Sequence, residues 1–374
     1  MNRDWETKTL NQIAINLDSK RIPITKADRI SGEHPYYGAS GVVDYVDSYI
    51  FEGDVLLISE DGANLLARTT PIAFAASGKF WVNNHAHILQ FSDLTTQRFV
   101  ELYINSIALD EYITGAAQPK LNQAALNSIP VPFPCPEEQR RIVTLLDEAF
   151  ADIATAKAIA EKNLQNAREL FINHLQSVFS TKGQDWVEMP LGEIGKVSMC
   201  KRIFKDQTTP TGDIPFYKIG TFGKEPDAFI PAEIYHQFRQ KYSFPNKGDV
   251  LVSAAGTVGR CVVYDGEDAY FQDSNIVWIA NDQTKLLNHF LYHFYSACDW
   301  NSTKGATISR LYNDNLRQIV IAYPQSLDEQ NRIAAQLDVL SEKTNQLTDI
   351  YRQKLTALDD LKKSLLHQAF SGQL

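Results

Sequence analysis

Several features that would place this 374-residue protein outside the cytoplasm are missing from its sequence. No apolar run approaches the ~20 residues that a transmembrane helix needs, and the first residues do not resemble a signal peptide. The four cysteines are scattered and form no C-x-x-C pair, which favours free thiols in a reducing compartment. We therefore expect a cytoplasmic protein with no membrane role.

Motifs that carry catalysis are missing as well. A Walker loop does not occur, because the gap between Gly192 and the Gly195-Lys196 pair is too short for one. The sequence has no asparagine-proline-proline-aromatic run of an amino-methyltransferase, and no glycine-rich cofactor fingerprint follows a predicted strand. We expect no catalytic residue and no cofactor in this chain.

Positive charge is also scarce, since the net charge is −9. A protein that binds DNA by itself is usually basic, because neutralised phosphates supply most of the affinity. Any nucleic-acid role therefore needs local basic patches or a partner that supplies positive charge.

The chain contains two copies of one sequence pattern, offset by 181 to 195 residues. GDVLLIS at 53–59 returns as GDVLVS at 248–253, and GAAQPKLN at 115–122 returns as GATISRLY at 305–312. EEQRRI at 137–142 returns as DEQNRI at 328–333, after which the offset stays at 191. This pattern indicates two similar modules related by a pseudo-two-fold axis, each with a variable globular part and a length-constrained helical part.

The globular parts read as β-rich mixed domains over residues 1–136 and 184–327. The clearest strands are expected at 80–91, 249–253, 261–264 and 275–279, and the clearest helices at 98–114 and 286–298. A long helix follows each domain, at 137–183 and 328–374. Pro136 is suited to a first helical turn, and Ser326-x-x-Glu329 forms a capping box before the second helix.

Both long helices carry a coiled-coil seam, with alternate spacings of four and three residues. The first seam is rich in alanine: Ile142, Leu146, Ala149, Ile153, Ala156, Ala160, Asn163, Ala167, Leu170 and His174. The second has larger side chains: Ile333, Leu337, Leu340, Thr344, Leu347, Tyr351, Lys354, Leu358, Leu361 and Leu365.

Two orientations of these helices oppose small residues to large ones. An antiparallel pair would set Ala149 against Leu358 and Ala167 against Leu340, while a parallel pair would set Ala149 against Leu340, so size alone leaves the orientation open. Connectivity favours the antiparallel pair, because the second domain must fit between the end of one helix and the start of the other. The sequence thus predicts an α+β fold in which two domains are joined by an antiparallel coiled coil.

These features together resemble the DNA-specificity subunit of type I restriction–modification systems. The residues that carry the resemblance are the duplicated E-Q-x-R-I helix starts at 138–142 and 329–333, the P-x-P-x-x-x-E-Q lead-in at 132–139, PYYGASG at 35–41, SEDGAN at 59–64, GAAQPKLN at 115–122 and LLHQAFSGQL at 365–374. The resemblance covers essentially the whole chain.

The resemblance implies two target-recognition domains, each of which reads one half of a bipartite, asymmetric site in double-stranded DNA. The paired helices would separate the domains and dock two modification subunits, which restriction subunits join. S-adenosylmethionine, ATP and Mg²⁺ would bind in these partners, and this chain would be non-catalytic. A seam from Ile142 to His174 would be roughly 48 Å long, somewhat more than one turn of B-DNA at ~34–36 Å, so that the helices could act as a ruler between the half-sites.

Candidate DNA contacts are the basic, hydroxyl, amide, carboxylate and imidazole side chains of the predicted loops. In the first domain they are Lys20, Arg21, Lys26, Tyr36, Tyr37, Ser40, Asp61, Asn64, Arg68, Asn84, His85 and Lys120. In the second they are Lys201, Arg202, Lys205, Lys218, Thr221, Ser253, Thr257, Arg260, Asp273, Ser274, Asn275, Lys304, Ser309 and Arg310. Arg202, Arg260 and Arg310 are the preferred base readers, because an arginine fork matches the acceptor edge of guanine.

Two histidine pairs could in principle hold a metal. His85 and His87 would share one face of a strand, but no third ligand is evident. His289 and His293 stand four apart on a predicted helix, a spacing that can hold zinc, without the glutamate of H-E-x-x-H. We expect no metal at either pair.

Two other functions remain open at this point. The chain could be the specificity subunit of another restriction class, or a coiled-coil adaptor whose domains bind proteins. Loops that combine lysine and arginine with aromatic and amide residues favour DNA over protein as the ligand.

Overall fold

The computed structural model describes residues 5–115, 117–298, 300 and 311–374. In this part of the chain no helix is both long and apolar enough to cross a membrane. The chain divides into two compact units. Unit 1 comprises residues 1–161 and 352–374, and unit 2 comprises residues 162–351.

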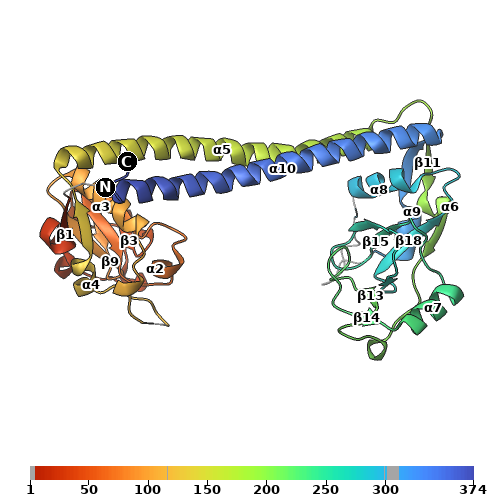
Figure 1. Cartoon of the computed structure of the whole chain (residues 1–374), viewed down its shortest axis with the longest axis horizontal. Helices are drawn as coiled ribbons and strands as arrows, with labels where there is room; N and C mark the ends of the chain where they lie inside the picture. The colour runs from red at the N-terminus through yellow and green to blue at the C-terminus, as the bar shows by residue number, and fades with distance from the viewer. Residues whose placement is uncertain (1–4, 116, 299, 301–310) are drawn as a thin grey trace. The chain divides into compact units, whose positions relative to one another are not determined.

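Unit 1 is built from short strands and helices in the first third of the chain (Figure 1). They are β1 (Glu6–Thr9), α1 (Leu10–Ile13), β2 (Ile15–Asn16), η1 (Asp18–Lys20), η2 (Lys26–Asp28), β3 (Ser31–Gly38), β4 (Gly41–Val46), β5 (Phe51–Glu52), β6 (Val55–Ser59), α2 (Asn64–Ala67), β7 (Ala73–Ala76), β8 (Lys79–Val82), β9 (Ala86–Gln90), α3 (Leu94–Ser106), η3 (Asp110–Tyr112), α4 (Gln123–Ser128) and β10 (Pro130–Phe133).

Unit 2 repeats this plan with its own elements (Figure 1). They are β11 (Trp186–Pro190), α6 (Leu191–Ile194), β12 (Gly195–Ser198), η4 (Lys205–Gln207), β13 (Ile214–Tyr217), β14 (Phe229–Ile230), α7 (Ala232–Lys241), β15 (Val250–Ser253), β16 (Cys261–Val263), β17 (Tyr270–Phe271), β18 (Ile276–Asn281), α8 (Asn288–Ala297), α9 (Asn313–Gln318) and β19 (Val320–Pro324).

The two units share one sheet topology. In unit 1 the central sheet has the order β2-β9-β6-β7, and in unit 2 the corresponding sheet has the order β12-β18-β15-β16. A second sheet in each unit contains a parallel pair, β3 with β8 in unit 1 and β13 with β17 in unit 2. This second sheet has four strands in unit 1 and three in unit 2. The internal repeat and the α+β class predicted from the sequence are confirmed.

Two of the expected elements differ from the observed ones. The strand expected at 80–91 is two strands, β8 and β9, separated by a turn at residues 83–85. The helix expected at 98–114 begins earlier, at Leu94, because the Asp93 side chain accepts a hydrogen bond from the Thr96 N–H and caps the first turn. It ends at Ser106, and the chain continues into a separate 3₁₀ turn.

The long helices are α5 (Pro136–Ser180) and α10 (Leu327–Phe370), and each contributes one part to each unit. In unit 1 they run antiparallel: the Arg141 guanidinium donates to the Leu374 carbonyl at 2.9 Å, and Lys157 pairs with Asp359 at 2.7 Å. The antiparallel orientation is therefore confirmed.

The register of the two helices differs from the predicted one. The pair Lys157–Asp359 cannot form if Ala149 lies opposite Leu358, so the predicted register is wrong by about two helical turns. Small residues oppose large ones in several registers of a heptad pattern, so this pattern could not select one.

Parts of the predicted seams are also exposed. In α5 the seam changes face after Ala167, because Leu170 and His174 are exposed while Leu175 is buried. In α10, Leu347, Lys354 and Leu361 are exposed.

The repeated glutamine of the E-Q-x-R-I motif has a structural role. Gln330 is fully buried at the start of α10; its amide group donates to the carbonyls of Lys285 and Pro324, and its oxygen accepts from the Leu287 N–H. Gln139 in unit 1 likewise donates to the Pro134 carbonyl. Each glutamine therefore fixes the turn between the last strand of a unit and the long helix that follows.

The helix start at α10 also corrects the expected capping box. The Ser326 hydroxyl accepts from the Glu329 N–H at 3.3 Å, which is one half of that box. The Glu329 carboxylate instead pairs with Arg332 on the same helix, at 2.6 Å.

We predict that Gln330→Met destabilises the protein by about 3 kcal/mol, because it leaves several buried backbone groups without hydrogen bonds. Gln353→Met, at an exposed position of the same helix, is the matched control and should change stability by less than about 0.5 kcal/mol. Urea unfolding of the full chain, followed by circular dichroism, measures both. Equal effects of the two substitutions would contradict the role assigned to Gln330.

Candidate nucleic-acid interface

Several loops meet beside β6 and β9 in unit 1. The Glu60 N–H donates to the His85 carbonyl at 2.9 Å, and the Glu60 carbonyl accepts from the Leu121 N–H at 2.8 Å. The Arg21 side chain joins them, since it donates to the Ala86 carbonyl at 2.8 Å. We call the loops at 17–21, 59–64, 83–86 and 117–121 loop cluster 1.

Unit 2 contains the same backbone arrangement. The Ala254 N–H donates to the Asn275 carbonyl at 2.7 Å, and the Ala254 carbonyl accepts from the Leu311 N–H at 2.8 Å. Arg202 pairs with Asp273 at 2.9 Å and so connects a further loop. We call the loops at 199–205, 253–260, 272–275 and 311–314 loop cluster 2.

A network of charged side chains connects the loops of loop cluster 1. The buried His87 lies between Asp18, at 2.5 Å from Nδ1, and the Leu121 carbonyl, at 2.7 Å from Nε2. Arg21 pairs with Glu60 at 2.6 Å. Lys120 pairs with the same carboxylate at 3.1 Å. Each carboxylate is thereby compensated by at least one basic group.

The network also sets the pKa values of its two acids. Burial alone would raise the pKa of Asp18, but the hydrogen bond and charge of His87, with the Ile88 N–H and Arg21, hold that pKa below its usual range. Burial would also raise the pKa of Glu60. Arg21, His87 and Lys120 have the opposite effect, and the pKa of Glu60 is lowered as well. Both carboxylates are therefore ionised at neutral pH.

Several predicted contact residues of unit 1 serve the fold. Tyr36 is buried, and its hydroxyl bonds the backbone of Ile24. Asn64 holds the turn to Thr70. Arg68 donates to three backbone carbonyls, and burial lowers its pKa. These hydrogen bonds favour a structural role for Tyr36, Asn64 and Arg68. Arg21 has such a role too, because it pairs with Glu60 inside the protein.

Other predicted residues of unit 1 are placed to reach a ligand. Tyr37 is half-buried against Phe74 and Phe80. Asp61 accepts from the exposed His85 at 2.8 Å, which orients that imidazole. The exposed members of the predicted set are Lys20, Lys26, Ser40, Asn84, His85 and Lys120.

In unit 2 the three preferred arginines differ in their placement. The Arg202 side chain is 60% exposed, and only its Nε bonds Asp273. Arg260 donates to the Phe222 carbonyl. Arg310 lies outside the described residues, as do Lys304 and Ser309.

The remaining predicted residues of unit 2 divide in the same way. Ser253 is buried and bonds the Thr257 carbonyl, and Thr221 bonds the backbone of Lys218. The Lys218 ammonium pairs with Asp227. Exposed or partly exposed residues are Lys201, Lys205, Thr257, Asp273, Ser274 and Asn275.

Some exposed aromatic and apolar residues, in loop cluster 2 and on a strand of unit 1, were not predicted as contacts. Phe204 and Tyr312 are exposed in loop cluster 2, and Val43 and Tyr45 are exposed on β4 in unit 1. Apolar side chains can contact the thymine methyl group. For Phe204 and Tyr312, the position between basic and polar loop residues was the available sequence signal.

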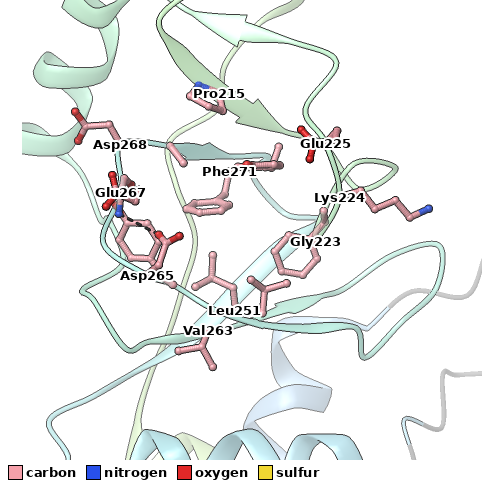
Figure 2. Close-up of a pocket in the computed structure, with 15 residues that line it drawn as sticks. Pro215, Gly223, Lys224, Glu225, Leu251, Val263, Asp265, Glu267, Asp268 and Phe271 are labelled. Carbon is pink, nitrogen blue, oxygen red and sulfur yellow. Dashed lines mark hydrogen bonds between the residues drawn. The ribbon is translucent and has the colours of Figure 1, made fainter. Parts of the chain in front are cut away.

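A separate hollow in unit 2 has the opposite electrostatic character. It encloses about 390 Å³ and is lined by Tyr217, Leu251 and Phe271 (Figure 2). Glu225, Asp265, Glu267 and Asp268 surround it, with Lys224 as its basic residue. This excess of carboxylates disfavours phosphate, so loop cluster 2 is the better candidate for DNA.

Two copies of one α+β unit, each with the same loop cluster and a share of both long helices, define a duplicated two-module protein. The chain belongs to the family described as the type I restriction modification DNA specificity domain, whose model matches residues 2–162 and 183–357.

Individual relatives agree with this assignment. A Haemophilus influenzae protein named as the type I restriction enzyme specificity subunit S.HindORF215P is 44% identical over 349 residues, which cover 92% of this chain and 89% of the relative. The type I restriction enzyme MjaIX specificity subunit of Methanocaldococcus jannaschii is 24% identical over 241 residues, or 57% of this chain and 55% of that one.

Two solved structures share the fold. One, described as the structural basis of complex assembly and conformational transition of the type I R-M system, has a TM-score of 0.76 at 18% identity and covers 100% of this chain and 99% of its own. The HsdS subunit from Thermoanaerobacter tengcongensis has a TM-score of 0.63 at 17% identity, with 100% and 98% covered.

We predict that Asp18→Asn destabilises unit 1 by about 3–5 kcal/mol at pH 7, because Arg21 and His87 lose a buried partner. Since the folded-state pKa of Asp18 is lowered, its contribution is present above the usual aspartate pKa and is lost as the pH falls below about 4. The difference in stability between Asp18→Asn and the wild type should therefore become smaller in acid. Thermal unfolding at pH 7 and at about pH 3, below the usual aspartate pKa, measures this.

The matched control for this prediction is Asp61→Asn, in the same loop cluster. Asp61 pairs with an exposed histidine, so its loss should cost less than about 1 kcal/mol. A pH-independent difference between Asp18→Asn and the wild type would contradict the role of the network.

Proposed function

We propose that this chain recognises a bipartite, asymmetric site in double-stranded DNA and holds two modification subunits and the restriction subunits together in a type I restriction–modification complex. Methyl transfer and cleavage take place in the partner subunits. S-adenosylmethionine, ATP and Mg²⁺ bind there, and this chain is non-catalytic.

The repeated loop cluster carries this proposal. Both clusters have the same backbone hydrogen bonds around Glu60 and Ala254, yet their side chains differ. In cluster 1 the Glu60 carboxylate pairs with Arg21 and Lys120, whereas Ala254 at the equivalent position has no side-chain group that could pair with a lysine or an arginine. One scaffold that presents two different sets of side chains suits a site whose two halves differ in sequence.

Arg202 is the strongest candidate for a base contact. Asp273 holds its Nε, and among the described residues its two terminal nitrogens make no hydrogen bond. The side chain is thus oriented while its outer donors stay available for the O6 and N7 acceptors of guanine. The exposed Lys201 and Lys205 flank it and are suited to phosphate contacts.

We predict that Arg202→Ala weakens recognition of one half-site by about 1–3 kcal/mol, the value of one bidentate base contact. The matched control is Arg239→Ala, which removes another exposed Arg–Asp pair from unit 2, on α7. Mapping of methylated bases in DNA from cells that express the chain with its modification subunit measures both variants. Unchanged target preference in Arg202→Ala would reject this assignment, and so would an equal change in Arg239→Ala.

The long helices present the same pair of exposed apolar residues in each unit. Ile159 and Leu361 are 53% and 46% exposed in unit 1, and their repeat equivalents Ile350 and Leu170 are 56% and 51% exposed in unit 2. Exposed apolar side chains on a helix are typical of a protein interface. Two equivalent sets support two copies of one partner, which we take to be the modification subunit.

We predict that Leu170→Asp with Ile350→Asp reduces the number of bound modification subunits from two to one, since a charge in an apolar interface is costly to bury. Gln353→Asp, at an exposed polar position of α10, is the control and should leave two. Native mass spectrometry of the assembled complex counts the subunits. Retention of both subunits by the double variant would contradict this docking surface.

A further inference from the structure

A second group of side chains with ligand chemistry lies in unit 2, outside loop cluster 2. His289 and His293 stand one turn apart on α8, with ring centroids 5.6 Å apart. Their Nε2 atoms approach the carboxylate of Asp338 on α10, at 2.6 Å and 2.9 Å. One potential ligand atom from each residue lies within 4.8 Å of the other two.

The surroundings of this group favour a cation. A cavity of about 430 Å³ opens beside His293 and Asp338, and Glu342 and Asp349 also line it. None of the described residues that line this cavity is a lysine or an arginine. Glu342 follows Asp338 by one helical turn, so it lies on the same face of α10 and can supply a further oxygen.

We propose that His289, His293 and Asp338 bind a zinc ion that ties α8 to α10. Two imidazole nitrogens and a carboxylate oxygen are ordinary zinc ligands, and Glu342 or a water molecule completes a tetrahedral site. Zinc binds each ring at Nε2 in place of the proton that faces Asp338, and each neutral imidazole then carries its proton on Nδ1. This site is separate from DNA recognition, and it replaces the expectation, drawn from the sequence, that no metal binds here.

The other groups of similar composition are less suited to a metal. Asp18, Glu60 and His87 in unit 1 also lie within ligand distance of one another. Arg21 and Lys120 already pair with these carboxylates, so added positive charge would be repelled. His85 and Asp61 form a pair without a third ligand among the described residues.

The test uses the full chain without a histidine tag, freed of metal with EDTA and titrated with Zn²⁺ in a calorimeter. We expect one zinc ion per chain and a rise in melting temperature on binding. His289→Gln and Asp338→Asn should each weaken zinc binding by at least about tenfold. Both residues are exposed enough to be replaced without loss of the fold, whereas the buried His293 is left intact.

The matched control is His85→Gln, which removes a similarly exposed histidine that pairs with an aspartate in unit 1. It should bind zinc as the wild type does. Co²⁺ in place of Zn²⁺ gives a second readout, because tetrahedral ligation produces visible absorption bands that both variants should lose. Absence of saturable zinc binding in the wild type would overturn the proposal. Binding that is unchanged in His289→Gln and Asp338→Asn would do the same.

Discussion

The packing of a long-helix end against a short helix of the domain is the interaction on which each unit depends. In unit 1, Phe370 at the end of α10 contacts Phe99 of α3 edge-on, with ring centroids 5.3 Å apart. In unit 2, Phe179 at the end of α5 contacts Phe290 of α8 in the same way, also at 5.3 Å. Each domain core is therefore completed by a segment from a long helix, and the antiparallel pairing follows from this requirement.

Duplication preserved the scaffold and left the side chains free to diverge. The buried glutamines at the helix starts and the backbone bonds around Glu60 and Ala254 recur in both units. The charges around them do not recur, because Glu60 anchors basic side chains that unit 2 cannot hold at Ala254. A fold that fixes loop backbones independently of their side chains allows one framework to recognise different DNA sequences.

Exposure of the candidate contacts could not be predicted from the sequence. Arg21 and Arg202 occupy equivalent positions in the two copies, at an offset of 181 residues. Arg21 is held by Glu60 and Asp18, whereas Arg202 bonds one aspartate through Nε and remains 60% exposed. Their carboxylate partners are distant in sequence, so only the folded chain shows which arginine is engaged inside the protein.

The sequence by itself determined the duplication, the α+β class, the two long helices and the family, because these depend on local periodicity and on motifs in order. Tertiary structure decided the helix register, because a heptad pattern matches itself again at every seventh residue. Contacts outside the pattern, such as Phe370 on Phe99 and the pair Lys157–Asp359, select one alignment. Tertiary structure also decided which polar residues are buried and placed His289 and His293 beside Asp338. Such contacts join segments that are distant in the chain, so no periodic pattern in the sequence predicts them.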